Sequence, residues 1–202
     1  MKTINNNPIA ILVLILLSFS NSLSVQSQTI GPNSNGSDNA TTALNVANTT
    51  PLENSAYSYY IRGIAFDNDS DYDQAVVELS KAIVLNPNYT EALDKRGMIY
   101  VKMIKYNKAL KDFNKAIKIN PTYAEAYNHR GITLYCMKEF LAAINDYNKA
   151  LSIEPEYAKV YYNRGIVKLE MNDEIGAQID FTKASELKVE EATKYLSMEN
   201  NW

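Results

Sequence analysis

Four arginines stand at equal intervals along this chain, and each is followed sixteen residues later by a carboxylate. Such a pattern can form bidentate ion pairs, or it can present a row of guanidinium groups to an anionic ligand. Positions sixteen apart lie nearly opposite each other in two antiparallel helices. We therefore expect an ion pair inside every unit, with anion binding as the alternative. The pairs are Arg62 and Glu78, Arg96 and Asp112, Arg130 and Asp146, and Arg164 and Asp180.

His129 and Cys136 are the one candidate pair of base and nucleophile in the sequence. They lie seven residues apart on one predicted helix, which separates them by about 10.5 Å along its axis. A catalytic dyad needs contact at about 3 Å. The sequence also contains no phosphate-binding loop, His-Glu-x-x-His motif or Gly-x-Ser-x-Gly motif. We expect no catalysis, cofactor or small-molecule substrate.

The composition excludes several other classes of function. The net charge of −3 over 202 residues provides no basic surface for nucleic acid or an anionic membrane. A single cysteine allows no internal disulfide, and with one histidine it also lacks the ligand spacings of a metal site. Apolar residues at 46% and charged residues at 21% are normal for a globular protein.

The arginines belong to a repeat of 34 residues, which is typical of a stacked array. A glycine follows each arginine, at Gly63, Gly97, Gly131 and Gly165. Alanines follow each glycine at twelve and nineteen residues, for example Ala109 and Ala116 after Gly97. We expect Gly97 to face Ala109 so that two helix backbones can approach, with Leu93 opposite Phe113.

Apolar residues in each repeat recur at helical spacing over two segments of about fourteen residues. The fold class is therefore all-α, an α-solenoid of four antiparallel helix pairs. Thr50, Pro51 and Glu53 form a capping pattern that predicts the start of the first helix at Pro51. A stripe of Ala192, Tyr195 and Leu196 predicts a capping helix at about 190–199.

These positions resemble the tetratricopeptide repeat family over Ala56 to Glu191. The resemblance rests on a bulky residue before the glycine, the glycine, an aromatic before the second helix, the two alanines and a proline. It is most similar to the variety with Asn163-Arg164-Gly165 and Asp112-Phe113-Asn114-Lys115-Ala116. It implies a right-handed superhelix with repeats at 56–89, 90–123, 124–157 and 158–191, in which the first helix of each pair lines a concave groove.

The resemblance also implies a protein or peptide as the partner. The groove residues that it implies are Tyr57, Tyr60, Ile64, Asp67, Asp94, Met98, Val101, Asn128, Ile132, Tyr135, Lys159, Tyr162 and Ile166. This surface suits an extended peptide with a basic group near Asp67 and Asp94. The positions that bind a terminal carboxylate in some chaperone-binding relatives lack the required set, because they are Tyr57, Ile61, Lys95, Glu125 and His129.

The amino-terminal segment predicts export. Lys2 precedes an apolar run from Ile9 to Leu17, which is typical of a signal peptide over residues 1–24, and an uncleaved anchor over residues 9–25 is the alternative. Residues 25–50 are rich in Asn, Ser and Thr and predict a disordered linker before a repeat domain at 51–199. We expect an exported interaction scaffold. The alternative is a self-assembling factor, a homo-oligomer, of a membrane-associated complex.

Overall fold

The computed structural model describes residues 54–199, and all of the regular structure in this part of the chain is helical. Consecutive helices pack as antiparallel pairs, so the predicted all-α solenoid is confirmed. The helices are α3 (Ala56–Asn68), α4 (Tyr72–Leu85), α5 (Thr90–Lys102), α6 (Tyr106–Ile119), α7 (Ala124–Cys136), α8 (Phe140–Ile153), α9 (Ala158–Glu170), α10 (Glu174–Glu186) and α11 (Glu190–Glu199).

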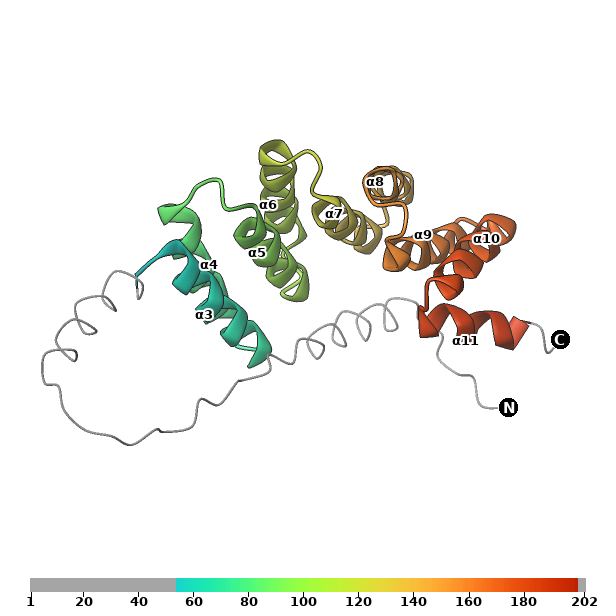
Figure 1. The fold of residues 1–202 in the computed structure, drawn as a ribbon, viewed down its shortest axis with the longest axis horizontal. Coiled ribbons are helices and arrows are strands. Elements are labelled where there is room, and N and C mark those ends of the chain that lie inside the picture. The colour runs from blue at the N-terminus through green and yellow to red at the C-terminus, as the bar shows by residue number, and fades with distance from the viewer. Residues whose placement is uncertain (1–53, 200–202) are drawn as a thin grey trace, which may run out of the picture.

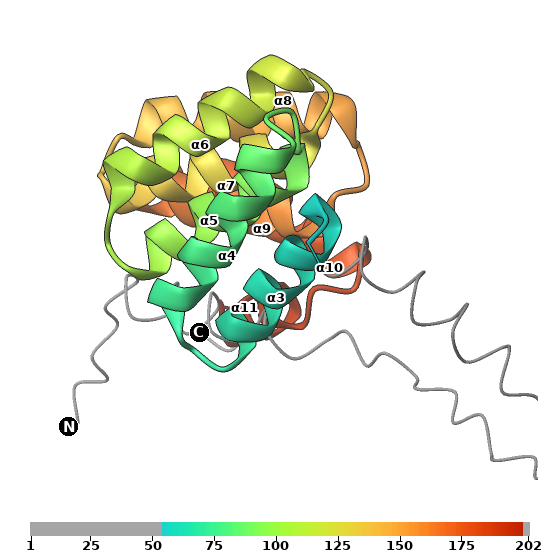
Figure 2. The ribbon, with the colours of Figure 1, turned by 90° about the vertical axis from the view of Figure 1, so that its left-hand side faces the viewer.

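The helix pairs follow one another along an arc (Figure 1). Helices α5, α7 and α9 lie on the inner side of the arc, and α6 and α8 lie on the outer side. The view from the end shows α3 and α11 below the other helices, so both ends of the array curve toward the same side (Figure 2). We call the accessible surface of α3, α5, α7 and α9 on the inside of the arc the inner face. The right-handed sense of the superhelix stays a prediction.

The first helix begins later than its capping pattern predicted. Helix α3 starts at Ala56, and the side chain of Ser55 accepts a hydrogen bond from the Ser58 N–H at 3.1 Å. This bond satisfies one of the free donors of the first turn, so the helix starts after Ser55 and the predicted start at Pro51 was wrong. Residues 51–53 lie outside the described part of the chain.

The two helices of each pair are joined by a tight turn that repeats every 34 residues. The residue after the helix cap has a positive φ in every repeat, at Ser70, Ile104, Lys138 and Asn172. In the second repeat the Lys105 N–H donates to the Tyr100 carbonyl at 2.7 Å, which is the long hydrogen bond of a Schellman motif. The turn therefore uses left-handed backbone without glycine, and Ile104 adopts it with φ 58° although its side chain is β-branched.

The glycine that recurs in every repeat makes room for a larger neighbour than the sequence predicted. A Cβ atom at Gly97 would lie 2.6 Å from the Phe113 ring, and one at Gly131 would lie 2.7 Å from the Tyr147 ring. The large side chain sixteen residues on therefore covers each of these glycines. At Gly63 the Ala75 carbonyl, twelve residues on, would also lie 3.3 Å from such a Cβ. The glycine thus makes room for a large side chain as well as for the expected approach of the two backbones.

The arginine pairs are confirmed, and they extend further than expected. Nε and Nη2 of Arg130 donate to the two carboxylate oxygens of Asp146 at 2.7 and 2.6 Å. Nη1 of Arg130 donates to Asn114 Oδ1 at 2.6 Å, in the second helix of the preceding repeat. Arg96 makes the same link to Ser80 and Arg164 makes it to Asn148. Arg96, Arg130 and Arg164 therefore each join their own helix pair to the pair before it.

The last repeat is closed by α11, as predicted for a capping helix. Ala192 is buried against α10, and the rings of Phe181 and Tyr195 lie 4.5 Å apart. Lys168 forms a second ion pair with Asp180, with a distance of 2.8 Å between Nζ and Oδ2. The three earlier repeats have Phe66, Tyr100 and Leu134 at this position, so the lysine of the last repeat adds to the ion-pair network at the end of the array.

The predicted signal peptide, anchor and linker lie outside the described residues, and the segment 9–25 stays a predicted membrane tether. Among the helices of residues 54–199, none combines the length and the apolar character that crossing a membrane requires.

Candidate functional site

Polar side chains tie neighbouring helices of the inner face together at positions 35 residues apart. Lys102 Nζ lies 2.6 Å from Asp67 Oδ1, which joins α5 to α3. Asn163 Nδ2 donates to Asn128 Oδ1 at 3.0 Å, which joins α9 to α7. Because these contacts connect the first helices of successive repeats directly, they fix the rotation of each helix and thus the side chains that reach the inner face.

The corresponding contact between α5 and α7 is made by His129. Its Nδ1 lies 2.8 Å from Asp94 Oδ1, and the Asp94 side chain is buried. His129 is half-buried and also packs against the Phe113 ring at 6.1 Å between ring centres. The histidine therefore serves to orient two helices, which agrees with the structural role expected from its spacing.

Only some of the residues predicted to line the groove are accessible in the structure. Tyr57 and Lys159 are exposed, with 63% of Tyr57 accessible. Another six of the predicted residues are half-buried, namely Tyr60, Ile64, Asp67, Met98, Tyr162 and Ile166. The remaining five are buried, so their expected exposure in a groove is corrected: they pack between helices. These five are Asp94, Val101, Asn128, Ile132 and Tyr135.

The predicted contact of a basic partner group with Asp67 and Asp94 is also not supported. Both carboxylates already face a side chain of this chain, since Asp67 pairs with Lys102 and Asp94 with His129. A partner would have to displace these contacts. The charge that a partner can meet on the inner face must come from other residues.

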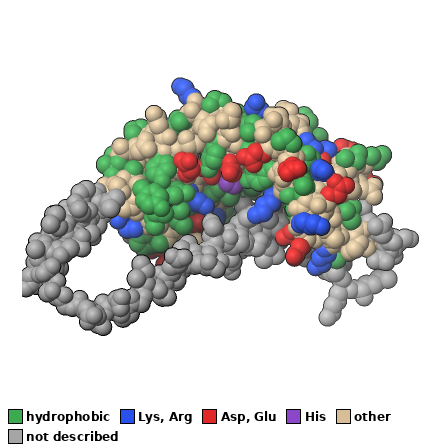
Figure 3. All heavy atoms as spheres, viewed as in Figure 1, with side chains coloured by type: hydrophobic (Ala, Val, Ile, Leu, Met, Phe, Trp, Pro, Cys, Tyr) green, Lys and Arg blue, Asp and Glu red, His purple; other side chains and the backbone are tan. Residues whose placement is uncertain are grey.

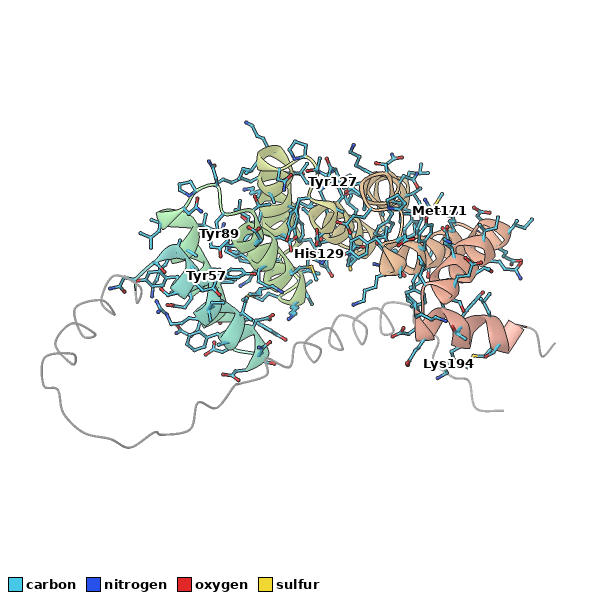
Figure 4. All side chains as sticks on the ribbon, viewed as in Figure 1. Tyr57, Tyr89, Tyr127, His129, Met171 and Lys194 are labelled. Carbon is cyan, nitrogen blue, oxygen red and sulfur yellow. The ribbon has the colours of Figure 1, made fainter. Side chains whose placement is uncertain are left out.

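Three tyrosines outside the predicted groove set lie at the start of inner-face helices. Tyr89, Tyr123 and Tyr157 each directly precede a helix of the inner face, at α5, α7 and α9. The ring centres of Tyr60 and Tyr89 lie 5.1 Å apart. Figure 4 shows Tyr57 and Tyr89 near each other between α3 and α5, whereas Tyr127 lies toward the outer helices. Recurrence every 34 residues was the signal that could have found these tyrosines.

Carboxylates accompany these tyrosines and influence their titration. Burial, together with the nearby Tyr89, Glu91 and Asp94, raises the pKa of Tyr60 to about 12. Burial also raises the pKa of Tyr123, to which the charges of Asp94 and Glu125 add. These phenols therefore stay neutral at physiological pH. Figure 3 shows acidic side chains in a row across this face, beside hydrophobic ones and above the histidine.

The remaining candidates for chemistry do not form a reactive site. Burial raises the pKa of the Cys136 thiol, which favours the protonated form rather than the thiolate that a nucleophile needs. Within residues 54–199, no three side chains of the His, Cys, Asp and Glu types gather at a distance that could hold a metal ion.

Comparison with known proteins agrees with this geometry. A family model described as "TPR repeat" matches residues 105–138 and 134–172. None of the curated proteins matches this sequence. Solved structures share the fold. MamA residues 41 to the end from Desulfovibrio magneticus RS-1 is 28% identical with a TM-score of 0.61, covering 68% of this chain and 77% of its own.

Two further solved structures show the same fold at lower identity. A crystal structure of MamA has a TM-score of 0.62 at 24% identity and covers 75% of this chain and 86% of its own. The first TPR of Spaghetti (RPAP3), bound to the HSP90 peptide SRMEEVD, has a TM-score of 0.57 at 22% identity and covers 58% of this chain and 94% of its own. The family model thus identifies tetratricopeptide repeats at residues 105–172, and the helix pairs of residues 56–186 share their 34-residue period.

Proposed function

We propose that this chain is a non-catalytic scaffold whose inner face binds an extended segment of a protein partner. The observation that carries the proposal is the accessible apolar and aromatic character of this face. Tyr57 is 63% exposed, and Tyr60, Met98 and Tyr162 are half-buried on α3, α5 and α9. Aromatic side chains that lose little entropy on binding are the usual anchors of protein interfaces.

A relative supports the same use of the fold. The first TPR of Spaghetti holds a peptide, although at 22% identity it shows only that this fold can do so. The inner face here lacks the residues that would bind a terminal carboxylate, since Tyr57 and Glu125 stand at two of the required positions. The partner segment is therefore expected to bind through its side chains rather than through its chain end.

The test is a pull-down from native membranes with two matched triple variants. The first removes inner-face side chains by Tyr57→Ala, Tyr60→Ala and Met98→Ala. The control removes exposed side chains of the second helices α8 and α10, which we call the outer face, by Leu141→Ala, Ile175→Ala and Ile179→Ala. Proteins that the wild type and the control retain should be lost from the inner-face variant. Equal retention by the inner-face variant and the wild type, with both variants folded, would contradict the proposal.

Self-assembly is the second candidate, and one observation favours it. Leu141 and Met171 line a surface crevice beside the amino-terminal end of α8, and the exposed Ile175 and Ile179 lie on α10. Ile175 is 76% exposed. Exposed apolar side chains that lie together are typical of an interface. Light scattering should give a dimer or larger species that Ile175→Asp dissociates, and a monomer at all concentrations would remove this candidate.

We also propose that the scaffold acts outside the cytoplasm. The charged start at Lys2 and the apolar run from Ile9 to Leu17 support this location. Sequencing the amino terminus of the mature protein distinguishes the two modes of export. A new terminus at Val25 would indicate cleavage, whereas an intact terminus in the membrane fraction would indicate an anchor. An intact terminus in the soluble cytoplasmic fraction would contradict export.

A further inference from the structure

The inner face carries negative charge that no side chain of the described region neutralises. Glu91 on α5 is exposed, Glu125 on α7 is half-buried, and Glu154, at the carboxyl end of α8, is exposed. Within residues 54–199 none of the three forms an ion pair, in contrast to Asp67 and Asp94. The negative charge of Glu125 also adds to the rise in the pKa of Glu154, so these two carboxylates of the third repeat influence each other.

Tyrosine rings lie among these carboxylates. The tilted rings of Tyr60 and Tyr89 lie 5.1 Å apart between centres, and the charge of Glu91 raises the pKa of both. Tyr123 is influenced in the same way by Glu91 and Glu125. A cation gains energy over the face of a tyrosine ring and more beside a carboxylate. Rings and carboxylates side by side therefore complement a lysine or arginine side chain better than any neutral or acidic group.

The spacing of the repeats limits where such cations can stand in a partner. Helices α5 and α7 touch directly through Asp94 and His129, so their axes lie about 8–10 Å apart, as in packed helices generally. An extended chain in the polyproline II conformation rises about 3.1 Å per residue and turns once in three residues, so its side chains at i and i+3 face the same side about 9 Å apart. Glu91 and Glu125 occupy equivalent positions in these two helices. They are therefore matched by side chains about three residues apart in the partner.

The next repeat reverses the charge. Lys159 stands at the position of Glu91 and Glu125 in α9, and burial lowers its pKa without removing it from the inner face. The pair of glutamates is therefore not continued at this position of α9, which limits the match to two basic positions.

We propose that the inner face binds an extended segment with two basic side chains in an i, i+3 relation, whose cations contact Glu91 and Glu125 beside the tyrosines. This inference rests on the proposed function and names the chemistry of its partner. Exposed charge pairs contribute about 0.2–1 kcal/mol, so each carboxylate should account for about a two- to fivefold change in affinity.

The test measures fluorescence anisotropy with three labelled extended peptides of one Gly/Ser/Tyr background. They carry two lysines, two norleucines or two glutamates at positions i and i+3. The lysine peptide should bind most tightly and the glutamate peptide least. Glu91→Gln and Glu125→Gln should each weaken the lysine peptide about two- to fivefold, while the control Glu174→Gln on α10 should not. Raising the salt from about 0.1 M to about 1 M should remove the difference between the lysine and norleucine peptides.

The outcomes separate this inference from the proposed function. Equal binding of all three peptides, abolished by the Tyr57, Tyr60 and Met98 triple variant, would overturn the charge preference and leave the inner face as a binding surface. Tighter binding of the glutamate peptide, or no binding by any of the three, would also overturn the inference. Loss of the native partner only from the outer-face variant in the pull-down would instead contradict the proposed function.

Discussion

Arg130 and Asp146 form a two-pronged ion pair at 2.7 and 2.6 Å, and the third nitrogen of the same guanidinium reaches Asn114 in the preceding repeat. One side chain thus fixes the two helices of its own repeat and the position of the repeat before it. Asp146 is 6% exposed, so its charge depends on this partner. A lysine could not replace the arginine, because it lacks the planar fork that reaches three acceptors.

Arg130→Ala should lower the free energy of unfolding by about 3–5 kcal/mol, because it leaves the buried Asp146 charge without a partner. Urea unfolding measures the loss. Arg62→Ala is the matched control, since Arg62 has no preceding repeat within the described residues and its side chain is 42% exposed. Arg62→Ala should lower the free energy of unfolding clearly less than Arg130→Ala does. An equal loss at both positions would contradict the role of Arg130 as a link between repeats.

Gly131→Ala should destabilise the protein although alanine favours helices. The exchange alone stabilises a helix by about 1 kcal/mol, whereas overpacking costs about 1–3 kcal/mol. The new Cβ would lie 2.7 Å from Tyr147 Cε1, and Tyr147 is fully buried, so the overpacking term should dominate. In a double-mutant cycle with Tyr147→Ala, the cost of Gly131→Ala should fall. A cost that is the same in both backgrounds would show that the ring is not its cause.

The sequence predicted the helix pairs because small residues recur in phase over four repeats. It also predicted the Arg130–Asp146 pair, because positions sixteen apart oppose each other in any antiparallel pair of this length. It did not predict which residue covers Gly131, since Ala143 and Tyr147 lie one turn apart on α8. A small change in helix rotation decides between them, and spacing alone does not record that rotation.

The inner face was less predictable for a similar reason. Contacts such as Asp94 with His129 and Asp67 with Lys102 join residues of different repeats, and they depend on how one helix pair leans on the next. The family pattern therefore placed Ile132 and Tyr135 in a groove, whereas the packing buries them. The tyrosines before each inner helix were visible as a repeat, but their proximity to Glu91 required the fold.

Ile104→Gly should stabilise the protein by about 0.5–1 kcal/mol. A β-branched residue at φ 58° pays about 1–2 kcal/mol for left-handed backbone, and glycine avoids this at a smaller entropic cost. The Ile104 side chain is 73% exposed, so little packing is lost. Thermal unfolding should show a higher midpoint for Ile104→Gly than for Ser70→Gly, the same change at the equivalent turn. A lower midpoint for Ile104→Gly than for the wild type would show that its side chain stabilises the native state.

Tyr60 should make the stability fall in alkaline solution. Its pKa in the folded state is about 12, above the ordinary value of 10.0, so the folded state holds the proton more tightly than the unfolded state. The contribution is therefore complete below pH 10 and is lost as the pH rises toward 12. Urea unfolding at a series of alkaline pH values should show a shallower decline for Tyr60→Phe. Identical declines for this variant and the wild type would contradict the raised pKa.

Photo-cross-linking tests most directly whether partners bind the inner face. A benzophenone amino acid replaces either Tyr57 on the inner face or Ile175 on the outer face, which are 63% and 76% exposed. After irradiation with native membranes, position 57 should give an adduct. Excess wild-type protein should prevent this adduct, whereas an excess of the Tyr57, Tyr60 and Met98 triple variant should not. An adduct from position 175 and none from position 57 would contradict the assignment of the inner face as the binding surface.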